Sequence, residues 1–178
     1  MGRWSEMEIK SIKNFYTPNF FDRISLNFIL NKNYKKYYNH ATGYNYPICD
    51  NTRVFDELYE LFLKECKLLF GDFDLSPRNK KTCHCYRSKN DDYISVFHDH
   101  ERTSIINGVY YYDVKGGDSI SFLHNGKEQM YYPDKNELLI FPCHLIHKPN
   151  RPVGNKYRYS INMEIITTQS VDEIFNGK

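Results

Sequence analysis

The sequence lacks any apolar run near the roughly 20 residues that a membrane-spanning helix needs. It also lacks an excess of charge of one sign, because 24 Lys and Arg stand against 22 Asp and Glu and leave a net charge of +2. The first deficit excludes an integral membrane protein. The second gives no support to nucleic acid or an anionic membrane as the main partner. We therefore expect no membrane contact, and we do not favour nucleic-acid binding.

The sequence also lacks an even number of cysteines, which a complete set of disulfide pairs would need. The chain has five, and residues 1–13 alternate charged with apolar residues instead of forming the apolar core of a secretory signal. A disulfide framework is therefore not expected, and the pattern favours a reducing, cytoplasmic setting. At 178 residues the chain is long enough to bury one sizeable core, so we predict a single domain over residues 1–178.

Aromatic residues are abundant at 16% of the chain, mostly 16 Tyr and 12 Phe. Such residues favour strands. Helical signals nevertheless occur within residues 1–75, which we expect to form a helical part that packs on the rest. Thr17-Pro18 begins one pattern that runs to about residue 30, and a second begins at Asn51 or Thr52. The apolar stripe of the second helix should be Phe55, Leu58, Phe62, Cys66 and Leu69, with Gly71 as its C-terminal cap.

Between these helices, residues 31–46 combine lysines with tyrosines. Such a stretch can stack bases and contact phosphates. A solvent-exposed loop over the fold is the simpler interpretation and the one we favour.

After Ser76-Pro77 the pattern changes to short β-branched and aromatic runs separated by turn signals, and Asn125-Gly126 is a strong hairpin signal. The predicted strands are 81–88, 93–98, 105–114, 119–124, 128–132, 137–141 and 157–166. Two helices followed by about seven short strands predict a mainly β fold, a sandwich or jelly roll with helices on one outer face.

Two histidines in this region have the spacing of metal ligands. In an extended strand His98 and His100 point to the same side and Asp99 points away. A third ligand from a distant strand would complete one triangular face around a metal and leave the opposite positions open. Open sites of this kind are typical of non-haem Fe(II) oxygenases, in which two histidines and a carboxylate supply the face.

Residues 80–166 resemble the Fe(II)/2-oxoglutarate-dependent dioxygenases, and most closely a small subgroup with His-x-His in place of His-x-Asp. The matching features are His98-x-His100, Asn107-Gly108-Val109-Tyr110-Tyr111-Tyr112, Gly116-Gly117, Leu138-Leu139-Ile140-Phe141-Pro142, His147 and Arg158-x-Ser160. The resemblance implies a double-stranded β-helix over residues 80–166. It also implies Fe(II) and 2-oxoglutarate as cofactors, dioxygen as cosubstrate, and an oxidative reaction that usually ends in hydroxylation.

The same resemblance implies the metal ligands His98, His100 and His147. One departure is that His100 stands where the common pattern has a carboxylate. A bulge could bring Asp99 into the site instead, so Asp99 remains a reserve ligand. His144 is the alternative to His147.

Arg158 matches the arginine that binds the distal carboxylate of 2-oxoglutarate, to which a guanidinium can donate two parallel hydrogen bonds. Ser160, on the same strand face, would add a hydroxyl. Tyr111 falls where related hydroxylases present a tyrosine hydroxyl to that carboxylate, and a core position is equally compatible with it. No catalytic residue is expected beyond the metal site.

Three functions are compatible with these residues. The first is a 2-oxoglutarate-dependent hydroxylase of a peptide side chain or a small molecule. The second is a three-histidine cupin-type dioxygenase that uses no 2-oxoacid, against which Arg158 and Ser160 argue. The third is a jelly-roll binding module without catalysis.

Overall fold

The computed structural model describes residues 9–16, 35–36, 44–47, 53–90 and 96–176. Most of the regular structure in these segments is β. The long helix α2 (Arg53–Phe70) is the main exception, and a short helix α3 (Val171–Phe175) follows the last strand. A capping box between Ser170 and Glu173 begins α3.

Helix α2 follows the predicted apolar periodicity with one difference. Phe55, Leu58, Phe62 and Cys66 are all buried, whereas Leu69 is 40% exposed, so its assignment to the stripe was wrong. Tyr59 takes a buried position on that face instead. The helix ends as predicted, since Gly71 has a φ of +84° and its N–H donates to the Lys67 carbonyl.

Within the described residues, seven strands form the larger sheet, and all pairings are antiparallel. Their order across the sheet is β1 (Lys10–Ile12), β8 (Glu137–Pro142), β5 (Ile106–Asp113), β10 (Arg158–Ile165), β4 (Thr82–Ser88), β3 (Tyr44–Pro47) and β2 (Lys35–Lys36). Strand β10 is therefore central, with hydrogen bonds to β5 on one side and β4 on the other.

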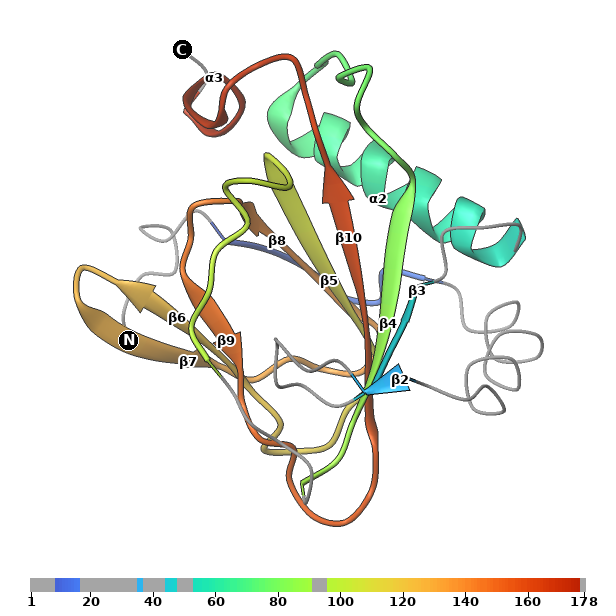
Figure 1. Ribbon diagram of the computed structural model, residues 1–178, viewed down its shortest axis with the longest axis vertical. Coiled ribbons are helices and arrows are strands. Elements are labelled where there is room, and N and C mark those ends of the chain that lie inside the picture. Colours follow the sequence, from blue (N-terminus) through green and yellow to red (C-terminus); the bar gives the residue numbers. More distant parts are fainter. Residues whose placement is uncertain (1–8, 17–34, 37–43, 48–52, 91–95, 177–178) are drawn as a thin grey trace.

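A smaller sheet contains β7 (Lys127–Tyr131), β6 (Ile120–His124) and β9 (His147–Pro149), in that order. The turn between β6 and β7 is the predicted hairpin, with positive φ at Asn125 and Gly126 as a type I′ turn requires. Figure 1 shows this sheet at the left of the view and α2 at the upper right, with the larger sheet between them. The predicted fold class, a mainly β fold of two sheets with helices outside, is confirmed.

Two apolar clusters separate these layers. One joins α2 to the outer face of the larger sheet through residues such as Phe62, Ile161 and Met163. The other fills the space between the sheets and includes Phe122 and Phe141. Because strand side chains alternate, β10 has apolar residues toward α2 and presents polar ones to the space between the sheets.

Several predicted elements differ from the structure. The helix expected at about residues 18–30 lies outside the described residues. The strand predicted at 93–98 is not a strand over its described part, residues 96–98, where His98 makes a single isolated bridge with His147. Three short strands, β1, β2 and β9, were missed, and Tyr44–Pro47 in the predicted loop 31–46 is strand β3. Most of these are short pieces that pair with residues distant in sequence.

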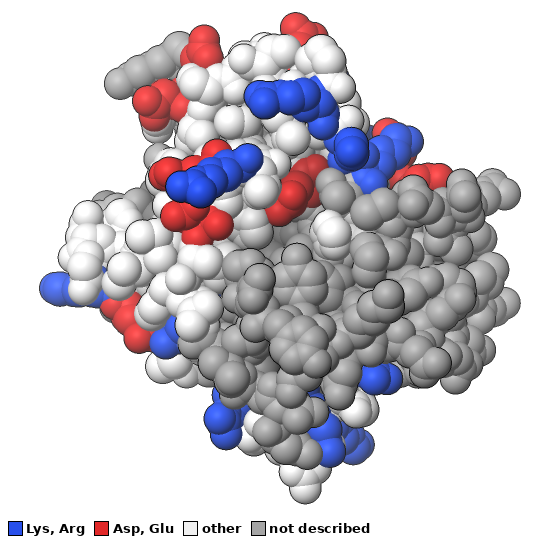
Figure 2. All heavy atoms as spheres, viewed as in Figure 1, with Lys and Arg blue, Asp and Glu red and all other residues white. Residues whose placement is uncertain are grey.

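In the described segments, no helix is long and apolar enough to cross a bilayer. Basic and acidic side chains lie intermingled over the upper part of the face shown in Figure 2. The upper part of this face therefore presents no continuous basic surface.

Candidate metal centre and its pocket

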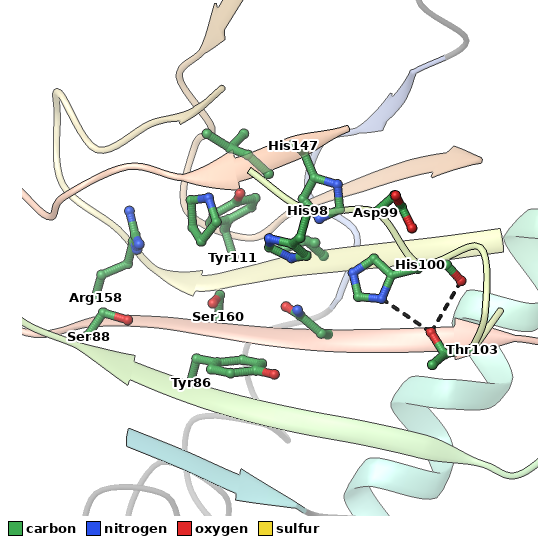
Figure 3. A pocket seen from close by; sticks show the side chains of 14 residues that line it. Tyr86, Ser88, His98, Asp99, His100, Thr103, Tyr111, His147, Arg158 and Ser160 are labelled. Atoms are coloured by element: carbon green, nitrogen blue, oxygen red, sulfur yellow. Dashed lines mark hydrogen bonds between the residues drawn. The ribbon is translucent and has the colours of Figure 1, made fainter. Parts of the chain in front are cut away.

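A pocket of about 180 Å³ opens between the two sheets. Residues of β4, β5, β6, β9 and β10 and of the segment before β5 form its wall. Those whose side chains Figure 3 labels are Tyr86, Ser88, His98, Asp99, His100, Thr103, Tyr111, His147, Arg158 and Ser160. Val109, Ile120, Pro149 and Asn162 complete the wall.

Three imidazoles meet at one end of this pocket. The ring centroids of His98 and His147 are 4.5 Å apart, and His100 lies 5.3 and 5.2 Å from them. One nitrogen from each ring lies within 4.8 Å of the other two, a spacing that one metal ion could bridge. The backbone explains the proximity. The His98 N–H donates to the His147 carbonyl and the reverse bond is also formed, while the His100 N–H donates to the Cys143 carbonyl.

All three rings have an oxygen at Nδ1. The carbonyl of Val96 lies 3.1 Å from His98 Nδ1, and that of Leu145 lies 2.8 Å from His147 Nδ1. A carboxylate oxygen of Glu164 lies 2.9 Å from His100 Nδ1. These oxygens only accept, so Nδ1 is the donor in each of these hydrogen bonds and Nε2 is the ring nitrogen that would bind a metal. The donor set therefore fits a divalent transition metal, because neutral imidazole nitrogen binds Fe, Ni, Cu and Zn.

His147 is the most enclosed of the three at 3% exposed, and the Phe141 ring packs against it with centroids 4.8 Å apart. Burial lowers the pKa of His147 well below its ordinary value, and the neighbouring His98 and His100 lower it further. The ring is therefore neutral near pH 7, which is the state that binds a metal.

The two alternative ligands lie outside this cluster. Asp99 is exposed and its carboxylate accepts the N–H of Glu101 at 3.2 Å. His144 is also exposed. The structure thus brings together the three histidines preferred from the sequence.

Arg158 lies across the pocket from the imidazoles, as Figure 3 shows. Its side chain is buried at 3% exposed, and one of its terminal nitrogens donates to the carbonyls of Asn150 at 2.9 Å and Ser119 at 3.4 Å. Both of these acceptors are backbone carbonyls, and they orient the guanidinium. The position suits a dianionic acid that reaches from the imidazoles to the guanidinium.

Ser160 and Tyr111 lie between these two ends and both line the pocket. Tyr111 is also part of the apolar cluster between the sheets, in agreement with a core position.

Tyr86 and Ser88 line the pocket and were missed from the sequence. Ser88 pairs with Arg158 across β4 and β10, and Tyr86 pairs with Ser160. The alternation of β4 could have indicated Tyr86 and Ser88 once the polar face of the neighbouring strand was known. Cys83 of β4 is buried, and its thiol donates to the Phe55 carbonyl at 3.7 Å.

No protein-family model matches the sequence, and no curated protein is similar to it in sequence. Solved structures do match. A prolyl hydroxylase from Trichoplax adhaerens, in complex with a peptide fragment of the oxygen degradation domain of hypoxia inducible factor, superposes with a TM-score of 0.71 at 15% identity. The match covers 91% of this chain and 84% of that one.

Two bacterial structures are similar to a comparable degree. A prolyl-4-hydroxylase from Pseudomonas putida has a TM-score of 0.65 at 11% identity and covers 93% of this chain and 95% of that one. HygX from Streptomyces hygroscopicus, with nickel and 2-oxoglutarate bound, has a TM-score of 0.70 at 11% identity, with 92% and 86% covered. The chain therefore has the double-stranded β-helix fold of 2-oxoglutarate/Fe(II) oxygenases, as predicted.

Proposed function

We propose that this protein is an Fe(II)- and 2-oxoglutarate-dependent dioxygenase. In this proposal His98, His100 and His147 hold the iron, and Arg158 and Ser160 bind the 2-oxoglutarate. The observation that carries it is the arrangement of one pocket, in which three imidazoles converge at one end and a buried guanidinium lies at the other.

Each group in the pocket has a separate task. The three histidines would hold the iron, and dioxygen would be the oxidant. Iron held there would supply the oxidative decarboxylation of 2-oxoglutarate to succinate and carbon dioxide. Arg158 would hold the distal carboxylate by two N–H donors, and the Ser160 hydroxyl would add a third. Tyr111 would offer its hydroxyl to the same carboxylate.

The walls of the pocket suit this chemistry. Val109, Ile120 and Pro149 give the pocket part of an apolar lining. An apolar wall excludes water and strengthens the electrostatic attraction between the guanidinium and a bound acid.

For the substrate we propose a peptide side chain or a small molecule, which would be hydroxylated. The structural likeness to prolyl hydroxylases, one of them bound to a peptide, supports the peptide option. The low net charge does not support nucleic acid.

A second candidate is a three-histidine dioxygenase that binds its substrate directly on iron and uses no 2-oxoacid. The composition of the cluster favours it, because the converging ligand atoms come from three imidazoles and from no carboxylate among the described residues. The buried Arg158 opposite them favours the 2-oxoacid.

Calorimetric titration with 2-oxoglutarate, in the presence and absence of Mn(II) as a redox-inert substitute for iron, separates these readings. The proposal predicts 2-oxoglutarate binding that requires the metal and disappears in His98→Ala. Metal binding without 2-oxoglutarate binding would favour the three-histidine dioxygenase. A protein that binds no metal would be a jelly-roll binding module without catalysis.

A further inference from the structure

His100 differs from the other two imidazoles in the acceptor that holds its Nδ1–H. For His98 and His147 the recorded acceptor is a neutral backbone carbonyl. For His100 it is the Glu164 carboxylate at 2.9 Å, with the Thr103 hydroxyl more distant at 3.5 Å. The imidazole that stands in place of a carboxylate is thus itself hydrogen-bonded to a carboxylate.

The backbone of Glu164 is fixed on every side. It belongs to the central strand β10, where it pairs with Thr82 of β4 and Asn107 of β5. The buried Tyr59 of α2 also donates its hydroxyl to the Glu164 carbonyl at 2.9 Å. The side chain of Glu164 is only 20% exposed, and that of His100 is 19% exposed. A fixed backbone and limited solvent access hold the carboxylate at the ring.

The contact between Glu164 and His100 affects the charge of the metal site. The common facial triad has two imidazoles and one carboxylate, so one ligand is anionic. Three neutral imidazoles provide no negative charge to a divalent metal. A carboxylate behind a ligating imidazole orients the ring and raises the basicity of the opposite nitrogen. Glu164 could therefore supply a negative charge to the site, one hydrogen bond away from the ligand His100.

His84 does not compete for this carboxylate at neutral pH. His84 is on β4, where it pairs with Asn162 of β10. It is close enough to Glu164 and His100 for both to influence its pKa. Burial is the largest influence and lowers the pKa of His84, so the ring is neutral near pH 7. The negative charge of Glu164 is then left to face His100.

We propose that Glu164 is a positioning residue of the metal centre, one that fixes the His100 ring with Nε2 toward the ion and supplies the negative charge that the three-histidine set lacks. The inference depends on the proposed metal site. It assigns to that site a fourth residue, which acts through His100 and does not itself touch the metal.

The test uses Co(II), whose affinity and visible absorption report on ligand number and geometry. Glu164→Gln keeps an acceptor of the same size at His100 but removes the charge, whereas Glu164→Ala removes both. We expect Co(II) affinity to fall by about 10-fold in Glu164→Gln and further in Glu164→Ala. The visible spectrum should shift in Glu164→Ala, because the ring is no longer fixed.

Glu101→Gln is the matched control, since it removes the same charge from an exposed position next to His100. We expect less than about a 2-fold change in its Co(II) affinity, because solvent screens an exposed charge. Melting of the metal-free variants reports on folding separately. If Glu164→Gln fails to fold, Glu164→Asp should fold and bind Co(II) more weakly than the wild type.

A second measurement separates charge from geometry. Without the carboxylate the Co(II) site is more positive, so the 2-oxoglutarate dianion should bind the loaded Glu164→Gln protein at least as tightly as the loaded wild type. Wild-type Co(II) affinity in Glu164→Gln and Glu164→Ala would overturn this inference alone. A wild-type protein that bound no metal would overturn the proposed function, and this inference with it.

Discussion

His98 and His147 exchange two backbone hydrogen bonds of 2.9 Å, the N–H of each residue donating to the carbonyl of the other. This isolated bridge joins the segment before β5 to the first residue of β9. The two rings are therefore brought together by main-chain pairing. We expect the metal-free protein to be folded, with the site already formed.

Replacement of any one of the three histidines should remove metal binding. His98→Ala, His100→Ala and His147→Ala each leave two imidazoles, and we expect Co(II) or Mn(II) affinity to fall by at least about 100-fold, as the metal loses one of its three protein ligands. Calorimetry measures this directly. His144→Ala, at an exposed histidine in the turn before β9, is the control and should bind the metal as the wild type does. Equal losses in all four variants would remove the triad from the site.

Asp99→Ala tests the reserve ligand. Its carboxylate is exposed and accepts the Glu101 N–H, so we expect metal affinity within about 3-fold of wild type, the change being limited to a screened surface charge. The measurement is the same titration, made beside His100→Ala. If Asp99→Ala lost the metal and His100→Ala kept it, the ligands would instead be the usual set of two histidines and a carboxylate.

Arg158 can be separated from the metal ligands by its effect on the acid alone. Arg158→Ala should leave Mn(II) affinity nearly unchanged and weaken 2-oxoglutarate binding by about 10- to 100-fold, the cost of losing charge-assisted hydrogen bonds. Arg158→Lys keeps the charge but lacks the two parallel N–H donors, so its 2-oxoglutarate affinity should lie between those of the wild type and Arg158→Ala. Arg151→Ala, an exposed arginine of the preceding loop, should bind the acid normally. Unchanged affinity in Arg158→Ala would exclude this residue from the acid site.

Gly108 of β5 tests the packing of α2 on the sheet. A Cβ built at this position would lie 2.5 Å from Cε2 of Phe62, a ring buried in the cluster under the helix. Gly108→Ala should therefore destabilise the protein by about 1–3 kcal/mol in urea unfolding. Gly116→Ala adds the same methyl group in open space and should change the free energy of unfolding by less than about 0.5 kcal/mol. Similar losses in both variants would show that Phe62 is not the cause.

Features set by local pattern were predictable from the sequence. The spacing of Phe55, Leu58 and Phe62 indicated α2, and Asn125-Gly126 indicated the hairpin between β6 and β7. The alternation of Arg158 with Tyr159 indicated a polar face on β10, because side chains of a strand alternate whatever the strand pairs with. The family resemblance, carried by the order of the motifs in residues 80–166, then predicted the fold and the three histidines as metal ligands.

Features set by contacts between distant residues were not predictable. Strand β1 exists through its pairing with β8, more than a hundred residues away, and β9 is three residues long. The segment at His98 reads as a strand in sequence, yet the structure gives it a single bridge. The contact between Glu164 and His100 depends on how the segment before β5 folds over β10, and no spacing in the sequence records it.

The central claim is that the imidazoles of His98, His100 and His147 and the guanidinium of Arg158 form one site for iron and 2-oxoglutarate. Its most direct test is the visible absorption spectrum of the protein after anaerobic addition of Fe(II) and then 2-oxoglutarate. We predict a charge-transfer band from the iron chelate of the 2-oxoacid, absent in His98→Ala and needing a higher 2-oxoglutarate concentration in Arg158→Ala. A wild-type protein that gave no band with saturating Fe(II) and 2-oxoglutarate would contradict the claim.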